Sequence, residues 1–179
     1  LLSGLNIKRE QIVSSQKVGP TVADDIKNSA WQATLFSIFV IFLYILARFR
    51  KWTFGMGAVV ALIHDVLFIM ALFSLLWGVI PFSLEIDQAF VAAILTVMAY
   101  SVTDTVVVFD RIREFLSIHK KGDMKPVIND ALNATLSRTI NTSLTIFFVL
   151  LSIFIFGGET IKGFAFALLV GIIVGTYSS

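Results

Sequence analysis

One carboxylate of this 179-residue chain lies in an unusual place for a helix residue. Asp104 follows the apolar stretch AFVAAILTVMAY and precedes TVVVF, and the next charged residue is Asp110. At 1.5 Å per residue, Asp104 lies roughly 9 Å inside Asp110, where a membrane-spanning helix would leave the hydrocarbon. An ionised carboxylate at that depth is costly unless it is protonated, paired or hydrated. Reversible proton binding is therefore the chemistry that Asp104 suggests, and a static buried hydrogen bond is the alternative.

Hydroxyl side chains accompany Asp104 on its own predicted helix. They form a polar stripe that consists of Tyr100, Ser101, Thr103 and Thr105. A stripe of this kind has to face protein or water rather than lipid, because unsatisfied polar groups are costly in hydrocarbon. We therefore expect it to lie against another helix and to support proton movement.

The following predicted helix offers a basic partner for this acid. Arg138, Asn141 and Thr142 share one side of that helix, so we expect Asp104 and Arg138 to lie close together or to be joined through water. Burial disfavours the charged form of a carboxyl group, whereas a nearby guanidinium favours it. A change in their distance could therefore couple a proton gradient to motion. Alternatively, Arg138 is an interfacial anchor whose long side chain reaches the membrane surface.

A second polar pair, His64–Asp65, lies nearly halfway along another predicted helix. One of these residues could be a second proton-handling group, or the pair could form a structural bond between helices. The other histidine, His119, is far away in the sequence, so the two histidines form no ligand cluster. The chain has no cysteine, which excludes disulfides and thiolate metal sites.

The sequence contains neither a nucleophile placed beside its base nor a phosphate-binding loop. We therefore expect a protein that is not an enzyme and that has no metal or organic cofactor, with protons as its coupling ion. The formal net charge of +2 is too small to imply nucleic-acid binding.

Composition indicates an integral membrane protein. The chain is 57% hydrophobic and 15% charged, whereas a soluble domain usually carries about a quarter charged residues. Its mean hydropathy is +0.89, and several apolar runs reach the roughly 20 residues that span a bilayer as a helix. The chain begins without Met and ends within an apolar run, so we expect a fragment of a longer polypeptide.

We predict an all-α polytopic membrane protein with a transmembrane domain at residues 28–179. Its spanning helices are predicted at about 29–47, 55–77, 88–115, 139–156 and 161–177. A cytoplasmic amphipathic helix is predicted at about 126–138, most simply on the bilayer surface. Ala167, Gly171 and Gly175 recur at intervals of four in the last span, a pattern that allows close helix packing.

Loop charges predict the orientation of these helices. The first and third connections are basic, and their basic residues include Arg48, Arg50, Lys51 and Lys125. The positive-inside rule places these connections in the cytoplasm. The N-terminal segment is then periplasmic and the end of the chain is cytoplasmic. Residues 1–27 are polar and contain a short alternating stretch, so we predict that they are the end of a periplasmic α+β domain and its linker.

Five stretches of the chain match a known family in the same order. They are VGPTVADD, ALIHDVL, YSVTDTVVVFDRIRE, TLSRTINTSLT and GFAFALLVGIIVGTYSS. With them the chain resembles the SecF protein-export family, or the SecF half of a fused SecDF, in the resistance–nodulation–division (RND) superfamily. The resemblance implies six membrane helices and a periplasmic domain between the first and the second of them. This chain would then hold the second to the sixth helix.

The resemblance also implies functional residues. The essential intramembrane aspartate of the family matches Asp104, and the essential arginine of the next helix matches Arg138. The chain departs from the usual pattern at Ala99, where the family has Gly, and at Thr103, where it has Asn. Thr can still donate and accept a hydrogen bond, so the surroundings of the aspartate are altered rather than abolished.

By this resemblance, the protein is an accessory subunit of the Sec protein-export machinery in the bacterial inner membrane. With SecD it would use the proton-motive force to drive or complete translocation of unfolded preproteins at the periplasmic side of the SecYEG translocon. Besides the lipid bilayer, its partners would be SecD, SecYEG and the preproteins, with no nucleic acid. One alternative is an RND-type proton-coupled exporter of small molecules or lipids. Another is a scaffold in which Asp104 and Arg138 form a permanent bond.

Overall fold

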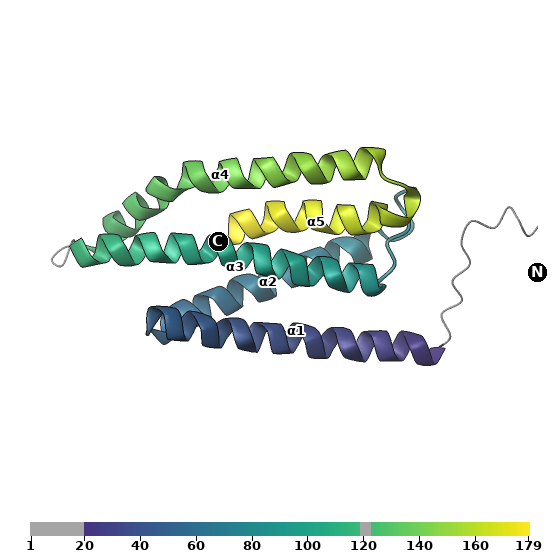
Figure 1. Cartoon of the computed structure of the whole chain (residues 1–179), viewed down its shortest axis with the longest axis horizontal. Coiled ribbons are helices and arrows are strands. Elements are labelled where there is room, and N and C mark those ends of the chain that lie inside the picture. Colours follow the sequence, from purple (N-terminus) through teal and green to yellow (C-terminus); the bar gives the residue numbers. More distant parts are fainter. Residues whose placement is uncertain (1–19, 119–122) are drawn as a thin grey trace, which may run out of the picture.

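The computed structural model describes residues 20–118 and 123–179, and these residues are helical except for short connections (Figure 1). The helices are α1 (Pro20–Phe49), α2 (Trp52–Leu76), α3 (Gln88–Ile118), α4 (Met124–Phe156) and α5 (Glu159–Ser178). Each contains a segment long and apolar enough to cross a membrane. The predicted all-α fold with five membrane-length helices is therefore confirmed in the described part of the chain.

Two helices, α1 and α4, begin well before their predicted starts. α1 already begins at Pro20, within the segment expected to belong to a periplasmic domain. The alternating stretch at residues 9–18 lies outside the described residues. α4 joins the amphipathic helix predicted at about 126–138 to the following span in one continuous helix. Asp123 caps its start by accepting a hydrogen bond from the backbone N–H of Lys125 at 3.3 Å, as is common at helix N-termini.

The continuity of α4 follows from one of its faces. Every fourth residue on that face is buried, and these residues are Val127, Ala131, Thr135, Thr139 and Ser143. This face crosses the predicted boundary without interruption and packs on α3 and α5. Leu132 and Leu136 of the same segment are exposed. Burial against neighbouring helices therefore explains this segment better than a helix that lies flat on the bilayer.

The helices surround α3, which packs on each of the other four (Figure 1). α5 packs on α2, α3 and α4, whereas α1 contacts α2 and α3 but neither α4 nor α5 within the described residues. Figure 1 shows α4, α5 and α3 in a row, with α2 crossing behind and α1 at the lower edge. The contact of α3 with every other helix makes it the element best placed to hold a site inside the bundle.

α3 and α5 approach each other closely at the stripe of small residues. A Cβ atom added at Gly171 would lie only 2.1 Å from Cγ2 of Val97, and one at Gly175 would lie 3.2 Å from Cβ of Ser101. Ala167, one turn earlier, is fully buried. Small residues at these positions thus let the backbone of α5 contact the side chains of α3 directly.

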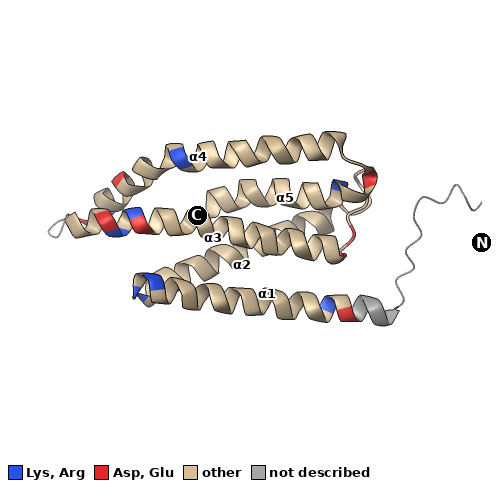
Figure 2. Ribbon diagram, viewed as in Figure 1, with Lys and Arg blue, Asp and Glu red and all other residues tan. Residues whose placement is uncertain are grey.

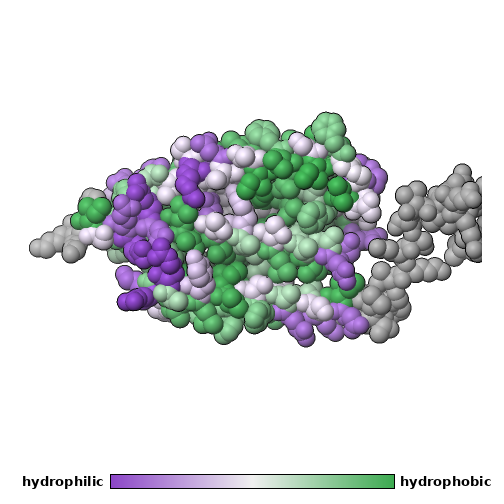
Figure 3. All heavy atoms as spheres, viewed as in Figure 1, coloured by the Kyte–Doolittle hydropathy of each residue, from purple (hydrophilic) through white to green (hydrophobic). Residues whose placement is uncertain are grey.

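Charge and hydropathy divide the surface into zones. Charged residues gather at the two ends of the bundle (Figure 2), and the surface between them is mainly apolar in the view of Figure 3. α1 exposes large apolar side chains along its middle, among them Leu35, Phe36 and Phe39. Such a surface suits contact with lipid or with other membrane helices, because its burial in hydrocarbon removes apolar area from water.

Candidate functional site

Asp104 lies at the junction of three helices. Its side chain on α3 is only 6% exposed. Thr139 Oγ1 of α4 donates a hydrogen bond to Asp104 Oδ1 at 3.0 Å, and Ser179 Oγ, just beyond α5, donates one to Oδ2 at 3.1 Å. Each carboxylate oxygen therefore has one hydroxyl partner, and each partner comes from a different segment of the chain.

A second group of hydroxyls joins the same three helices. Tyr100 Oη of α3 lies 2.7 Å from Ser143 Oγ of α4, which in turn lies 2.8 Å from Thr176 Oγ1 of α5. Ser143 Oγ also donates to the carbonyl oxygen of Thr139, the residue that holds Asp104. Ser143 Oγ and Thr176 Oγ1 both donate to backbone carbonyl oxygens, so this cluster holds α3, α4 and α5 together beside Asp104.

Asp65 of α2 forms a separate buried cluster with α3. Its carboxylate is fully buried and accepts a hydrogen bond from Ser101 Oγ at 2.8 Å. Nδ1 of the neighbouring His64 lies 3.2 Å from the other carboxylate oxygen, and the His64 side chain is half exposed. The pair expected from the sequence thus contacts α3 through Ser101, one turn before Asp104.

The structure does not bring Arg138 to Asp104. In the described part of the chain Arg138 makes no ion pair with Asp104, and its side chain is exposed. It lines a cavity of about 790 Å³ near the C-terminal ends of α1 and α3 and the first half of α4. Arg138 points away from Asp104 because Thr139, the next residue, faces the inside of the bundle. Successive residues of a helix are about 100° apart around its axis, so Arg138 and Thr139 cannot both face inward.

That cavity contains an arginine-rich cluster. Asp110 pairs with Arg48 at 2.8 Å and with Arg113 at 3.0 Å, and Glu114 pairs with Arg111 at 2.8 Å. Ion pairs at such exposed positions contribute little to stability. The first of them connects α1 to α3.

The other residues predicted for the polar stripes make no hydrogen bond to Asp104 among the described contacts. Thr103 is exposed and donates to the carbonyl oxygen of Ala99 in its own helix. Thr105 is buried and donates to the carbonyl oxygen of Ser101. Asn141 and Thr142 are exposed, and the Thr142 hydroxyl bonds to carbonyl oxygens of its own helix. Of the predicted stripe on α3, Tyr100 and Ser101 are the members whose hydroxyl groups bond to other helices.

Four hydroxyl residues of the site were not predicted from the sequence. They are Thr139, Ser143, Thr176 and Ser179. Thr135, Thr139 and Ser143 do carry a readable signal, because they recur at intervals of four on one helix face. The prediction chose the adjacent face of the helix instead, because that face carries Arg138.

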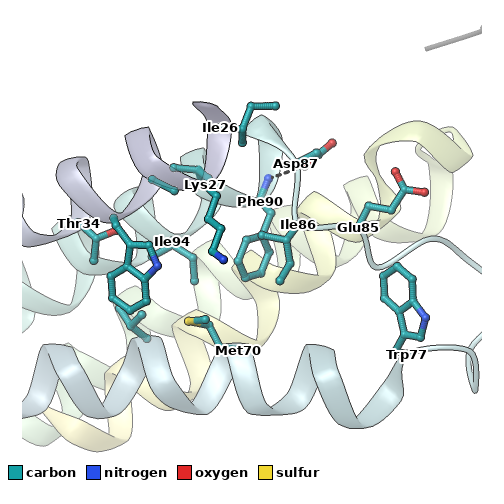
Figure 4. A pocket seen from close by; sticks show the side chains of 14 residues that line it. Ile26, Lys27, Thr34, Met70, Trp77, Glu85, Ile86, Asp87, Phe90 and Ile94 are labelled. Carbon is teal, nitrogen blue, oxygen red and sulfur yellow. Dashed lines mark hydrogen bonds between the residues drawn. The ribbon is translucent and has the colours of Figure 1, made fainter. Parts of the chain in front are cut away.

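A second cavity lies at the opposite end of the bundle. It has a volume of about 520 Å³ and lies between α1, α2 and α3 (Figure 4). Its walls are mostly apolar, with Met70, Phe90 and Ile94 among them. Lys27 reaches into the cavity in Figure 4. The side chain of Asp87 caps the start of α3, because its Oδ1 accepts a hydrogen bond from the backbone N–H of Phe90 at 2.8 Å. Neither Asp65 nor Asp104 lines this cavity.

Comparison with known proteins identifies the class to which this chain belongs. The family profile for the C-terminal part of the protein export membrane proteins SecD and SecF matches residues 3–179. The chain therefore belongs to the SecD/SecF C-terminal family, which confirms the resemblance noted in the sequence.

Individual relatives point to the SecF branch of that family. The protein translocase subunit SecF of Rhodothermus marinus is 56% identical over 169 residues, which are 94% of this chain and 54% of the relative. The SecF subunit of Cereibacter sphaeroides is 45% identical over 166 residues, or 93% of this chain and 49% of the relative. The chain thus spans about half the length of these relatives.

A solved structure shares the fold. The crystal structure of SecDF in its super-membrane-facing form matches with a TM-score of 0.78 and 37% sequence identity. The match covers 92% of this chain and 21% of the SecDF chain. The helical arrangement described above is therefore similar to that of part of the SecDF chain.

Proposed function

We propose that this chain is the membrane part of a SecF-type translocase subunit of the bacterial inner membrane. With SecD, it uses the proton-motive force to drive or complete translocation of unfolded preproteins on the periplasmic side of SecYEG. The names of its relatives support a role in protein export. The observation that carries the proton-driven mechanism is the buried Asp104 carboxylate, whose hydrogen-bond partners in the described chain are neutral hydroxyl groups.

Proton binding at Asp104 acts on the contacts between helices. The carboxylate accepts hydrogen bonds from Thr139 and Ser179, which belong to the α4 and α5 regions. A proton removes the negative charge that strengthens these bonds, so α4 and α5 can shift relative to α3. One proton that crosses a potential of 100 mV releases about 2.3 kcal/mol, equivalent to a factor of about 50 in an equilibrium. That energy is sufficient to change which of two helix arrangements predominates.

Arg138 takes part in another stage of the same cycle. It directly precedes Thr139, so a rotation of α4 by about 100° would bring the guanidinium to the position of the Thr139 hydroxyl. A guanidinium beside Asp104 would favour release of its proton. Arg138 therefore modulates the charge of the carboxylate, and the family resemblance matches it to an essential arginine.

SecD is the partner that covers the outer faces of α3 and α4. Thr103, Asn141 and Thr142 are exposed on these helices, although they lie within or next to apolar segments. Polar side chains are disfavoured against lipid, so this surface favours contact with another membrane protein or with water. The proposed role requires no covalent chemistry and no cofactor other than the coupling proton.

The decisive experiment is the Asp104→Asn variant of the full-length protein, assayed with SecD for preprotein export in the presence and absence of a proton gradient. We expect export to fall to the level measured without the gradient. Asp130→Asn is the matched control, because Asp130 is an exposed acid on α4, and it should export normally. Wild-type export by Asp104→Asn would refute the role assigned to this carboxylate.

An RND-type exporter of small molecules would use a proton site of the same kind. The apolar cavity of about 520 Å³ has a size suited to a small ligand. Depletion of the protein from cells distinguishes the two functions. A defect in the secretion of preproteins would support the role in protein export. Accumulation of small apolar compounds with normal secretion would instead support the exporter.

A further inference from the structure

Asp65 is a buried acid that the proton cycle at Asp104 does not use. It lies thirteen residues after Trp52 and eleven before Leu76. At 1.5 Å per residue, these distances are about 20 Å and about 16 Å from the two ends of α2. Asp65 is therefore close to the middle of its membrane-length helix, and its side chain is 0% exposed.

The contacts of Asp65 do not require an acid. Ser101 Oγ donates to one carboxylate oxygen at 2.8 Å, and an Asn side chain could accept the same hydrogen bond without a charge. An ionisable group at this depth costs several kcal/mol more than a neutral one when it is charged and unpaired. A purely structural bond between α2 and α3 thus leaves the identity of this residue unexplained.

The groups around Asp65 leave His64 as its proton partner. From α5, Gly175 approaches Asp65, because a Cβ added there would lie 3.6 Å from Asp65 Oδ2. From α3 the contact is Ser101, and α1 carries only Tyr44 as a titratable side chain between Lys27 and Arg48. Among the described residues, His64 is therefore the titratable group in contact with Asp65, with Nδ1 at 3.2 Å.

We propose that His64 and Asp65 form a second proton-binding site of this membrane domain. The half-exposed imidazole of His64 takes up a proton and transfers it from Nδ1 to Asp65 Oδ1, which leaves a neutral histidine and a protonated acid. Histidine suits this step because an imidazole side chain in general can gain and lose a proton near neutral pH. The inference rests on the proposed proton-driven function, but its test can fail separately.

The site is connected to Asp104 by two helices. Ser101 lies three residues before Asp104, or about 4.5 Å along α3, toward the end that bears the acidic loop. Gly175 beside Asp65 lies four residues before Ser179, which donates to Asp104. When Asp65 is protonated at Oδ1, Ser101 Oγ still donates to Oδ2, but the bond loses the negative charge that strengthens it. A proton at Asp65 therefore changes the contact between α2 and α3 next to the first site.

The test uses the full-length protein with SecD and two measurements. The first compares Asp65→Asn, Asp65→Glu and Asp104→Asn for export driven by a proton gradient. Asp65→Asn keeps the acceptor for Ser101, so a purely structural role predicts normal export. The proposal predicts export at the level without a gradient, and partial export for Asp65→Glu, which retains a carboxyl group. Asp130→Asn serves again as the control.

The second measurement is infrared difference spectroscopy of the protonated carboxyl band as a function of pH. The Asp104→Asn protein should retain a titrating band that disappears when Asp65→Asn is added. If that double variant does not fold, Asp65→Glu in the Asp104→Asn background should shift the same band. Loss of export with Asp104→Asn but not with Asp65→Asn would overturn this proposal and leave the proposed function intact. Normal export by both variants would overturn the proposed function, and absence of the second band would overturn the second site.

Discussion

The partners of Asp104 are suited to both of its protonation states. Thr139 and Ser179 contribute hydroxyl groups, which donate to a carboxylate and can accept from a protonated acid. A guanidinium, by contrast, only donates and always carries its charge. A permanent Asp104–Arg138 pair would therefore hold the acid ionised, whereas hydroxyl partners permit a proton to bind and leave. The position of Arg138 away from this acid fits a cycle better than it fits a static scaffold.

Replacement of Thr139 by Val tests this view at a single hydroxyl group. Val preserves the shape of Thr but removes the donor to Asp104 Oδ1, and a hydrogen bond to a charged group contributes about 1.5–3 kcal/mol. We expect proton-driven export by the full-length protein to fall roughly tenfold. Thr145→Val is the matched control, because the Thr145 hydroxyl is exposed on the same helix and, among the described residues, bonds only to the carbonyl oxygen of Asn141. Equal export by the two variants would contradict the assigned role of Thr139.

At the scale of helices, the spans could be predicted but the orientation of α4 about its axis could not. A long apolar run has few options in hydrocarbon other than a helix, which is why five spans follow from the sequence. α4 carries two adjacent polar faces, one with Thr139 and Ser143 and the other with Arg138 and Thr142. The choice between them depends on packing against α3 and α5, which no local pattern reveals. The contact between Asp65 and Ser101 is likewise tertiary, because it joins residues 36 positions apart.

The close contact between α3 and α5 gives a prediction about stability. Gly171→Ala would place Cβ 2.1 Å from Cγ2 of Val97, and Val97 is buried and stiff about χ1. We expect destabilisation of about 1–3 kcal/mol, as is usual for overpacked interiors. Thermal unfolding of the full-length protein in detergent measures the change. Val97→Ala in the same protein should recover part of the loss, because it removes both clashing methyl groups.

Gly57→Ala is the matched control for this experiment. Gly57 also lies within a helix, but an added Cβ there would meet its nearest neighbour, Phe109, at an ordinary 3.5 Å. Since Ala is the better helix former by about 1 kcal/mol, this variant should be as stable as the wild type or slightly more stable. If Gly57→Ala lowered the stability as much as Gly171→Ala, the effect of Gly171→Ala could not be attributed to the contact between α3 and α5.

At the scale of the whole molecule, charge distribution and helix order define a direction. The basic residues Arg48, Arg50 and Lys51 lie at one end of the bundle, and the loop with Glu85 and Asp87 lies at the other (Figure 2). Asp65 contacts Ser101, which precedes Asp104 on the path from the acidic end. A proton that enters from the periplasm would thus meet His64 and Asp65 before Asp104, provided that the basic end is cytoplasmic.

This proviso can be tested because the chain contains no cysteine. Lys51→Cys and Glu85→Cys place single thiols at exposed positions at opposite ends of the bundle, in a full-length protein whose other cysteines have been removed. The positive-inside rule places Lys51 in the cytoplasm, so a membrane-impermeant maleimide should label Glu85→Cys in spheroplasts and Lys51→Cys only after lysis. The opposite pattern would reverse the order of the two acids along the proton path. Asp65 would then be the later of the two acids that the proton meets, and His64 would lie on its exit side.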